Sequence, residues 1–183
     1  MSREKRKYEM KQRAAEMAET HVRITEAAIE LHGTVGPART TLSAVAKQAG
    51  VERRTLYRHF PTEAELFEAC STHYFAAHPF PDPTGWRVLE HALDELYAYY
   101  EQTAPMLANV LRDAELVEFA RDAVAPLHAY LDEAADVLLD GRRDPLLVAA
   151  VRHALAFSTW RSLNSLPRSD AVKLVTALVD KAS

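Results

Sequence analysis

Three arginines and a tyrosine lie within a six-residue stretch of this chain: Arg53, Arg54, Tyr57 and Arg58. In a helix turning 100° per residue, these side chains share an arc of roughly 140°. Arginine forms bidentate hydrogen bonds with guanine edges or phosphates, and tyrosine donates to phosphate oxygens. A charge cluster of this size alone would also fit a solvated basic face. The neighbouring segments decide between the two interpretations.

The preceding segment has the period of a helix with one buried face, formed by Leu42, Val45, Ala46 and Ala49. Thr41 stands where an N-cap hydroxyl belongs. Gly50 can adopt the left-handed conformation that ends a helix, and Val51 can then pack back under it. A second short helix follows over about 52–59, with Leu56 on the side opposite the arginines. The combination predicts a helix-turn-helix that presents a basic face to DNA.

The same residues carry a resemblance to a known family. Gly50-Val51, the run Thr55 to Thr62 and Glu65-Leu66 resemble the end of the DNA-binding domain of TetR-type transcriptional regulators. Further matches lie upstream, at Ile24, Ala27, Ala28, Leu31, Gly33, Thr41 and Ala46. Two positions depart from the pattern: Glu52 replaces a common capping Ser, and Glu63 replaces a Lys that ordinarily helps to hold phosphate. The resemblance covers about the first seventy residues.

The resemblance and the basic face together predict the residues that contact DNA. Arg53 or Arg54, at the start of the second helix, would read bases, and Tyr57 and His59 would hold the backbone, where the family places phosphate contacts. The complete predicted set is Thr41, Arg53, Arg54, Thr55, Tyr57, Arg58 and His59.

Composition predicts an all-α chain. The 183 residues are 48% hydrophobic, enough for a core, and contain five glycines and nine prolines with no alternating β-branched runs. A single cysteine excludes an internal disulfide, and the N-terminus is charged, so we expect a cytoplasmic protein without a membrane span. Cys70 is interpreted as a small core residue, because no basic group is paired with it in the sequence.

Charge and proline divide the chain in two. Residues 1–70 hold 12 Lys and Arg against 10 Asp and Glu, whereas residues 71–183 hold 10 against 16. The segment 78–85 contains three prolines and a glycine and must be a loop. We therefore predict a DNA-binding domain over 1–77, which includes a basic N-terminal extension and a connecting helix, and a helical effector-binding and dimerisation domain over 78–183.

The N-terminal extension allows two interpretations. Lysines and arginines alternate with glutamates from Ser2 to Glu19, before a helix predicted from about Ala14 to His32. This segment is either a frayed, solvated end or a basic arm that contacts phosphates or the minor groove, and it could extend the first helix.

Prolines set the predicted helix boundaries in the second domain. A helical stripe from Trp86 to Tyr100 should end near Pro105, before a short helix that contains Met106 and Leu111. Pro126 should kink or divide the next long segment, from about Leu116 to Leu139. One further helix is predicted from about Pro145 to Leu163.

The last helix, from about Ser169 to Lys181, is apolar over most of its circumference. Its polar side is one narrow stripe, while Val172, Leu174, Val175, Ala177, Leu178 and Val179 cover the rest. One intramolecular contact cannot use this much apolar surface, so we infer a homodimer. TetR-type proteins are similar in using their last two long helices for a four-helix dimer interface.

No sequence motif favours catalysis. The chain has eight histidines but no His-Glu-x-x-His, no Gly-x-Gly-x-x-Gly and no Walker-type motif, and no metal or other cofactor is predicted. Aromatic and histidine side chains on the second-domain helices could enclose an apolar cavity with a few polar anchors, or could be ordinary core. The resemblance implies a small-molecule effector there. The candidate residues are His91, Tyr97, Tyr100, Met106, Phe119, His128, His153, Phe157 and Trp160.

The sequence therefore predicts a homodimeric repressor that binds a near-palindromic double-stranded DNA operator and is released by a small-molecule effector. The alternative is a helical enzyme or ligand-sequestering protein whose basic helix is incidental. The operator, the regulated genes, the effector and the sign of regulation are not encoded in any pattern described above.

Overall fold

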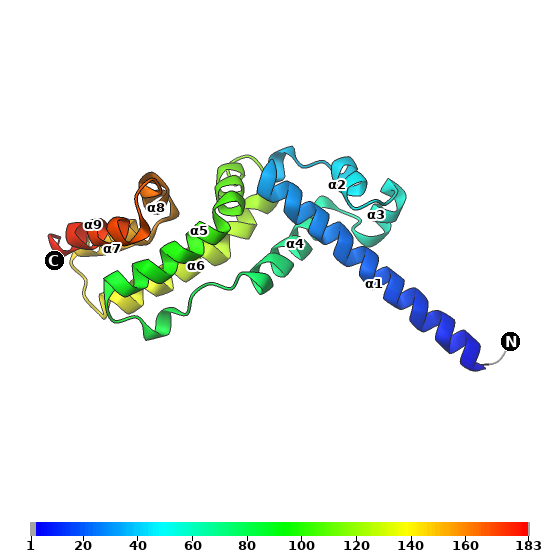
Figure 1. The fold of residues 1–183 in the computed structure, drawn as a ribbon, viewed down its shortest axis with the longest axis horizontal. Helices are drawn as coiled ribbons and strands as arrows, with labels where there is room; N and C mark the ends of the chain where they lie inside the picture. The colour runs from blue at the N-terminus through cyan, green and yellow to red at the C-terminus, as the bar shows by residue number, and fades with distance from the viewer. Residues whose placement is uncertain (1–2, 183) are drawn as a thin grey trace. The chain divides into compact units, whose positions relative to one another are not determined.

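The computed structural model describes residues 3–182 and confirms the all-α prediction (Figure 1). Within those residues the chain forms nine α-helices and two short 3-10 helices and no strand. It divides into two compact units, one made of residues up to 77 together with 108–122, and the other of residues 78–107 and those from 123 onward. The sequence-based boundary after residue 77 coincides with the end of the first stretch, while the segment 108–122, assigned by sequence to the second domain, packs within the first unit.

The first unit contains the predicted helix-turn-helix. Its elements are α1 (Arg3–Thr34), η1 (Pro37–Arg39), α2 (Leu42–Gln48), α3 (Arg53–His59) and α4 (Glu63–Ala77). It also holds the end of α5 (Leu89–Asp113) and the start of α6 (Glu118–Leu139).

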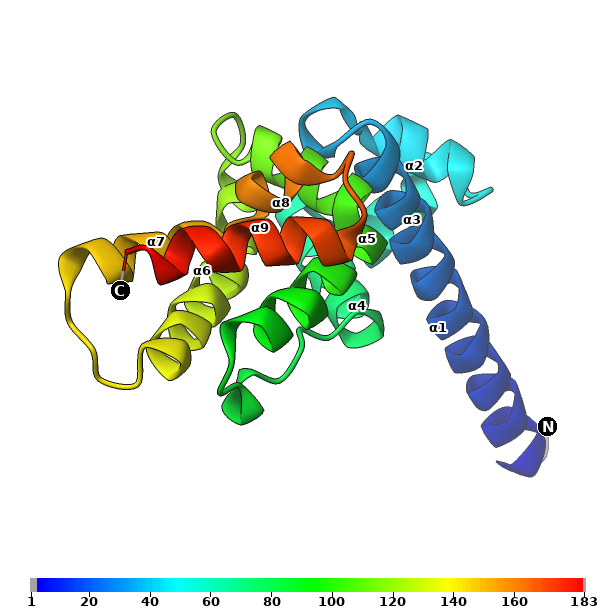
Figure 2. The same cartoon turned by 60° about the vertical axis from the view of Figure 1, so that its left-hand side comes forward.

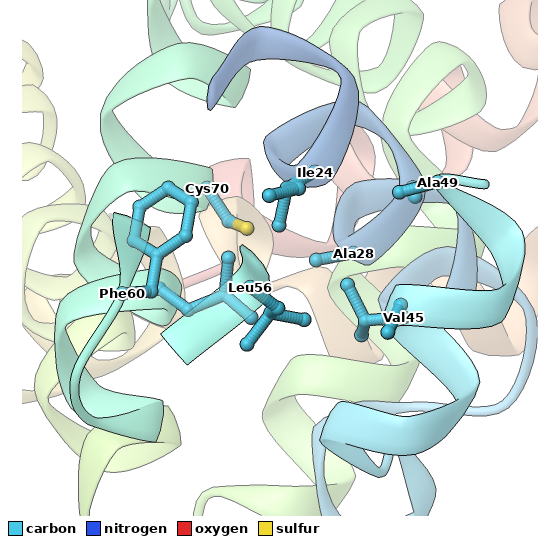
Figure 3. Close-up of a cluster of buried hydrophobic side chains, with 10 residues drawn as sticks. Ile24, Ala28, Val45, Ala49, Leu56, Phe60 and Cys70 are labelled. Atoms are coloured by element: carbon cyan, nitrogen blue, oxygen red, sulfur yellow. The ribbon is translucent and has the colours of Figure 1, made fainter. Parts of the chain in front are cut away.

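One hydrophobic cluster joins the first four helices. Ile24 and Ala28 of α1, Val45 of α2, Leu56 of α3 and Cys70 of α4 point toward one another (Figure 3). Ile24, Ala28, Val45 and Leu56 are completely buried. A fully buried aliphatic side chain of this size contributes roughly 1.5–3 kcal/mol. The cluster therefore fixes short helices that would not be stable alone. Cys70 is a core residue, and burial raises the pKa of its thiol to about 12.

The helix α1 begins much earlier than the predicted position near Ala14. It is continuous from Arg3, and its N-terminal part extends beyond α2, α3 and α4 in both views (Figures 1 and 2). Residues 4–19 are exposed except for Glu9, which is half-buried. The basic extension is therefore helical, because straight-chain residues and alanine dominate it and no Gly or Pro interrupts it.

The second unit contains the remaining elements, η2 (Pro83–Gly85), α7 (Pro145–Leu155), α8 (Phe157–Leu163) and α9 (Arg168–Asp180), with the larger parts of α5 and α6. Trp86 is buried but precedes α5, so its predicted place on the helical stripe was wrong. Its indole nitrogen donates to Oε2 of Glu95 at 2.8 Å.

Proline does not end the helices where the sequence predicted. The helix α5 continues through Pro105 to Asp113, so the predicted break and separate short helix were wrong. Pro126 lies inside α6 and does not divide it. The buried side of α5 continues past the proline at Leu107 and Val110, and this packing outweighs the backbone hydrogen bond that a proline removes.

A helix break is present where none was predicted. The expected helix from Pro145 to Leu163 is divided into α7 and α8 at Ala156, whose backbone is extended with φ −66° and ψ 138°. The hydroxyl of Tyr97 donates to the carbonyl of Ala154 at 2.9 Å, and that of Tyr100 to the carbonyl of Leu155 at 2.7 Å. Thr159 Oγ1 donates to the carbonyl of His153. These side chains replace hydrogen bonds that a continuous helix would have made, so the break costs little.

The last helix divides its apolar residues between two faces. Ala171, Val172, Val175 and Val179 are buried in their own chain, and α9 lies beside α7 (Figure 2). Leu174 and Leu178, one turn apart, remain 44% and 60% exposed. Val175 is therefore an internal core residue and cannot belong to a surface that a second chain covers.

We predict that His32 makes the stability of the first unit dependent on pH. The ring is 5% exposed and lies 5.0 Å from the ring of Phe67. Burial lowers its pKa from 6.5 to about 4, although the charge of Asp113 acts in the opposite direction. The folded protein thus binds this proton less readily than the unfolded chain, so the contribution is complete above pH 6.5 and is lost as the pH falls toward 4.

Urea unfolding of wild type and His32→Gln measures this contribution. The fall in unfolding free energy from pH 7 to pH 4 should be about 3 kcal/mol smaller in the variant. His128→Gln, at an exposed histidine, serves as the control and should behave as wild type. Equal pH dependence in wild type and His32→Gln would contradict the prediction.

Candidate nucleic-acid interface

The turn between α2 and α3 has the geometry that the sequence predicted. Thr41 caps α2, with its hydroxyl accepting from the backbone nitrogen of Ala44 at 3.1 Å. Gly50 has φ 64°, its nitrogen donates to the carbonyl of Lys47, and the nitrogen of Val51 donates to the carbonyl of Ala46 at 2.9 Å. This pair of hydrogen bonds is a Schellman motif, which ends a helix and reverses the chain.

The short helix α3 has one buried and one exposed side. Leu56 is fully buried, whereas Arg53, Arg54, Tyr57 and Arg58 are exposed. Glu52 precedes the helix but makes no capping hydrogen bond with its side chain, consistent with its departure from the family pattern. The burial of Leu56 therefore fixes the rotation of α3 so that three guanidinium groups and a phenol face outward.

Two of these exposed side chains are already paired. The guanidinium of Arg53 donates to the hydroxyl of Tyr57 at 3.1 Å and lies 5.7 Å from the centroid of its ring. Arg54 is 92% exposed, and its nearest ion pair, with Glu52, is 3.9 Å long. An exposed pair of that length contributes little, so Arg54 is freely available.

The other predicted DNA contacts differ in exposure. Thr41 is exposed, and Thr55 is half-buried. His59 turns inward: its Nε2 atom is buried without a hydrogen-bond partner, and its ring centroid lies 6.1 Å from that of His21. Burial, followed by the charges of Arg58 and His21, lowers the pKa of His59.

Side chains from the end of α5 hold the segment that leads into α2. Asn109 Nδ2 donates to the carbonyls of His32 and Gly33 at 3.1 and 2.8 Å, and Arg112 donates to the carbonyl of Val35 at 3.1 Å. The Asp113 carboxylate accepts from Arg112 and, at 2.9 Å, from the backbone nitrogen of Ala38. We define these three residues, Asn109, Arg112 and Asp113, as the α5 bracket.

Asp113 is charged although it is 1% exposed. Burial raises the pKa of its carboxyl, but the hydrogen bonds from Arg112 and Ala38 and the charges of Arg112 and Arg39 together bring it below the ordinary value. A buried carboxylate with this many donors is a fixed point in the structure. Sequence reasoning missed it because the backbone partner, Ala38, lies 75 residues away, and the pattern of α5 predicts burial but not partners.

The predicted effector residues do not form one group. The rings of Tyr100, Phe157 and Trp160 lie 5.2 to 5.8 Å apart, and Tyr97 stacks on Tyr100. The three histidines, His91, His128 and His153, are exposed, and His91 pairs with Glu95 at 3.2 Å. Phe119 belongs to the first unit, where it packs 4.8 Å from Phe67. Met106 is half-buried in the second unit.

Comparison with known proteins identifies the first unit. The sequence profile of the bacterial regulatory proteins of the tetR family matches residues 24–70, which span the end of α1 and all of α2 and α3. This segment of the chain therefore matches the tetR family of bacterial regulatory proteins. The matched family is described as one of regulatory proteins, which favours a regulator over the alternative of a helical enzyme.

The sequence matches to individual relatives are short. The transcriptional regulator TtgR of Pseudomonas putida is 46% identical over 54 residues, which are 30% of this chain and 26% of TtgR. The nucleoid occlusion factor SlmA of Vibrio campbellii is 50% identical over 38 residues, 21% of this chain and 19% of SlmA. The chain thus spans about a fifth to a quarter of these relatives.

Solved structures share the fold over most of the chain, beyond the segment that the family profile matches. A tetR-family transcriptional regulator of Streptomyces coelicolor superposes with a TM-score of 0.61 over 90% of this chain and 79% of that protein, at 20% identity. A TetR-like regulator of Rhodococcus sp. RHA1 superposes with a TM-score of 0.59 over 87% and 93%, at 18% identity. None of the helices within residues 3–182 is both long and apolar enough to cross a membrane.

We predict that Gly36 is required for the α5 bracket. Its φ is 93°, and a Cβ atom there would collide with the Arg112 guanidinium and the Asp113 carboxylate. Gly36→Ala should therefore lower the free energy of unfolding, measured with urea, by about 1–3 kcal/mol more than Gly141→Ala does. Gly141 is the matched control, because its φ is 77° but no atom lies within 4 Å of the added Cβ. Equal losses would mean that backbone strain alone determines the effect.

Proposed function

We propose that this chain is a transcriptional repressor that binds a near-palindromic DNA operator as a homodimer and is released by a small molecule. The observation that carries the proposal is the exposed side of α3, which consists of Arg53, Arg54, Tyr57 and Arg58. Buried Leu56, on the other side of the helix, keeps these four side chains facing outward. A helix of this size fits the major groove, and a two-fold dimer would place two such helices in successive grooves about 34 Å apart.

The remaining predicted contacts are assigned by position. Thr41 and Thr55 lie at the starts of α2 and α3, where short hydroxyl side chains reach phosphate oxygens. Lysines and arginines on the N-terminal part of α1 add positive charge, so this helix is proposed as a further phosphate contact. The Nε2 atom of His59 is buried in the present conformation. A phosphate contact by that atom therefore requires the imidazole ring to turn.

The effector is proposed to bind in the second unit near the buried aromatic group of Tyr97, Tyr100, Phe157 and Trp160. The two tyrosine hydroxyls hold the break between α7 and α8, so a ligand that competes for them would change the connection between these helices. Because a ligand shifts a conformational equilibrium only through differential affinity, release requires tighter binding to the form that does not fit DNA.

The α5 bracket supplies a route from effector to DNA. It lies at the end of a helix whose earlier turns carry Tyr97 and Tyr100, and it hydrogen-bonds the backbone just before α2. A shift of α5 along its axis would thus move the segment 32–38.

Selection of binding sites from random DNA tests the DNA-binding proposal and the assignment of base readers. Wild-type protein should recover a motif with two-fold symmetry. Arg53→Ala and Arg54→Ala should each relax one position per half-site, at a cost of about 1–3 kcal/mol, because an early arginine on the helix forms two bonds with one guanine. Tyr57→Phe should weaken all sites about equally, since phosphate contacts carry no base information.

Two outcomes oppose this prediction. Failure of the wild-type protein to enrich any DNA sequence at low salt would contradict the proposal that the chain binds DNA. Recovery of the wild-type motif by both arginine variants, together with an altered motif from Tyr57→Phe, would reverse the roles of the side chains.

The dimer is proposed to form through the exposed side of α9. Leu174 and Leu178 are the large apolar side chains of this helix that remain exposed in the chain itself. Leu174→Lys with Leu178→Lys would bury two uncompensated charges in such an interface, which costs several kcal/mol. We expect this variant to be monomeric by light scattering at micromolar concentration while its helical circular dichroism is unchanged.

Val88→Lys is the matched control. Val88 is also 60% exposed but precedes α5, outside α7 to α9. It should leave the oligomeric state unchanged. A Leu174→Lys, Leu178→Lys protein that is still dimeric would place the interface elsewhere.

A further inference from the structure

One acidic side chain stands directly beside the arginines of α3. Glu52 precedes the helix, and its side chain is 79% exposed. It is the only acidic residue between positions 51 and 62, in a stretch that otherwise carries three arginines. Its backbone carbonyl accepts from the nitrogens of Thr55 and Leu56 at 2.8 and 3.1 Å, so its place relative to the helix is fixed. The DNA contacts proposed above give this carboxylate no role.

A structural role does not account for Glu52. Its side chain makes no capping hydrogen bond with α3, whereas the hydroxyl of Thr41 caps α2 in this way. The ion pair of Glu52 with Arg54 is 3.9 Å long and joins two exposed groups, so it contributes little to stability. The rotation of α3 is fixed by buried Leu56 on its other side. The carboxylate is therefore available to a partner outside the chain.

Next to DNA, this carboxylate lowers affinity unless it meets a hydrogen-bond donor. The early residues of a recognition helix lie nearest the base edges in the major groove, and the phosphates of both strands repel a negative charge. Cytosine offers its N4 amino group there as a donor, while guanine and thymine present acceptors. Adenine places the acceptor N7 beside its amino group. Cytosine is thus the base that best offsets the charge of a carboxylate.

The neighbouring side chain has the complementary chemistry. Arg54 is 92% exposed, and its guanidinium nitrogen lies 3.9 Å from Oε2 of Glu52. Successive base pairs are about 3.4 Å apart along the duplex. An acceptor and a donor at this separation match two neighbouring base pairs, with the arginine on guanine and the glutamate on cytosine.

We propose that Glu52 is a specificity-determining residue, which selects cytosine at the base pair next to the guanine that Arg54 reads. The inference rests on the proposed function, because it requires α3 to lie in the major groove. The roles of the two side chains differ. An arginine raises affinity for all DNA and discriminates as well, whereas Glu52 discriminates by weakening the binding of every sequence that lacks the cytosine.

Selection of binding sites from random DNA with two variants of Glu52 tests the proposal. Glu52→Ala removes the acceptor and should lose the cytosine preference at one position per half-site. Glu52→Gln should gain adenine at that position, because an amide both donates to N7 and accepts from N6 of adenine. Arg54→Ala should instead relax the neighbouring guanine position.

Titration of labelled duplexes measures the size of the effect. Wild-type protein should bind the selected duplex about fivefold or more tightly than one in which adenine replaces this cytosine in both half-sites. Glu52→Ala should bind both duplexes equally. It should also bind a duplex of scrambled sequence about twofold or more tightly than wild type, because a charge that repels phosphate is gone.

Glu63→Gln is the matched control. It removes the same charge from an exposed position in the first turn of α4, where the resembling family has a lysine that holds phosphate. This variant should keep the cytosine preference of the wild-type protein. Circular dichroism of each variant reports whether it is folded.

Two results overturn the inference alone. In the first, both Glu52 variants recover the wild-type motif. In the second, only the guanine position relaxes, which would mean that Glu52 acts by orienting Arg54 and contacts no base. Failure of the wild-type protein to enrich any sequence removes the proposed function and this inference together, so the two failures are distinguishable.

Discussion

A single buried carboxylate ties the DNA-binding helices to the rest of the first unit. Asp113 accepts from Arg112 and from the backbone nitrogen of Ala38, and it is shielded from water. Removing either donor would leave a charge in a poorly solvated place, so the three groups can only be kept or lost together. This constraint holds the segment that leads into α2, while the buried cluster around Val45 and Leu56 sets the orientation of α2 and α3. The glycine at 36 is a consequence of the same crowding.

The sequence predicted most of the first unit because its signals are local. Thr41, Gly50 and Leu56 act on neighbours within a few residues, so spacing alone predicted the cap, the turn and the buried side of α3. Proline was a poorer guide. Pro105 and Pro126 predicted helix breaks that tertiary packing overrides. The observed break at Ala156 has no adjacent glycine or proline from which it could have been predicted. Two of the carbonyls at this break are satisfied by tyrosine hydroxyls more than fifty residues earlier in the sequence.

The candidate sites divide in the same way. The outward face of α3 is a property of one helix, and periodicity was sufficient to predict it. The α5 bracket depends on contacts between distant segments, and no pattern in one helix could reveal it. The histidines proposed for an effector illustrate the limit: residue type suggested an anchor, but His91, His128 and His153 face solvent because they lie off the buried stripes of their helices.

The contact between Arg53 and Tyr57 links two side chains that would otherwise act separately. A guanidinium held against a phenol ring has lost part of its rotamer freedom before any partner arrives, so less entropy remains to be lost on association. The same contact makes the two positions non-additive, since changing either residue also changes the conformations open to the other. With α3 reading DNA as proposed, a new sequence preference would be reached more readily through Arg54, whose contact with Glu52 is long and exposed, than through Arg53. The chain therefore carries one constrained and one adaptable arginine side by side.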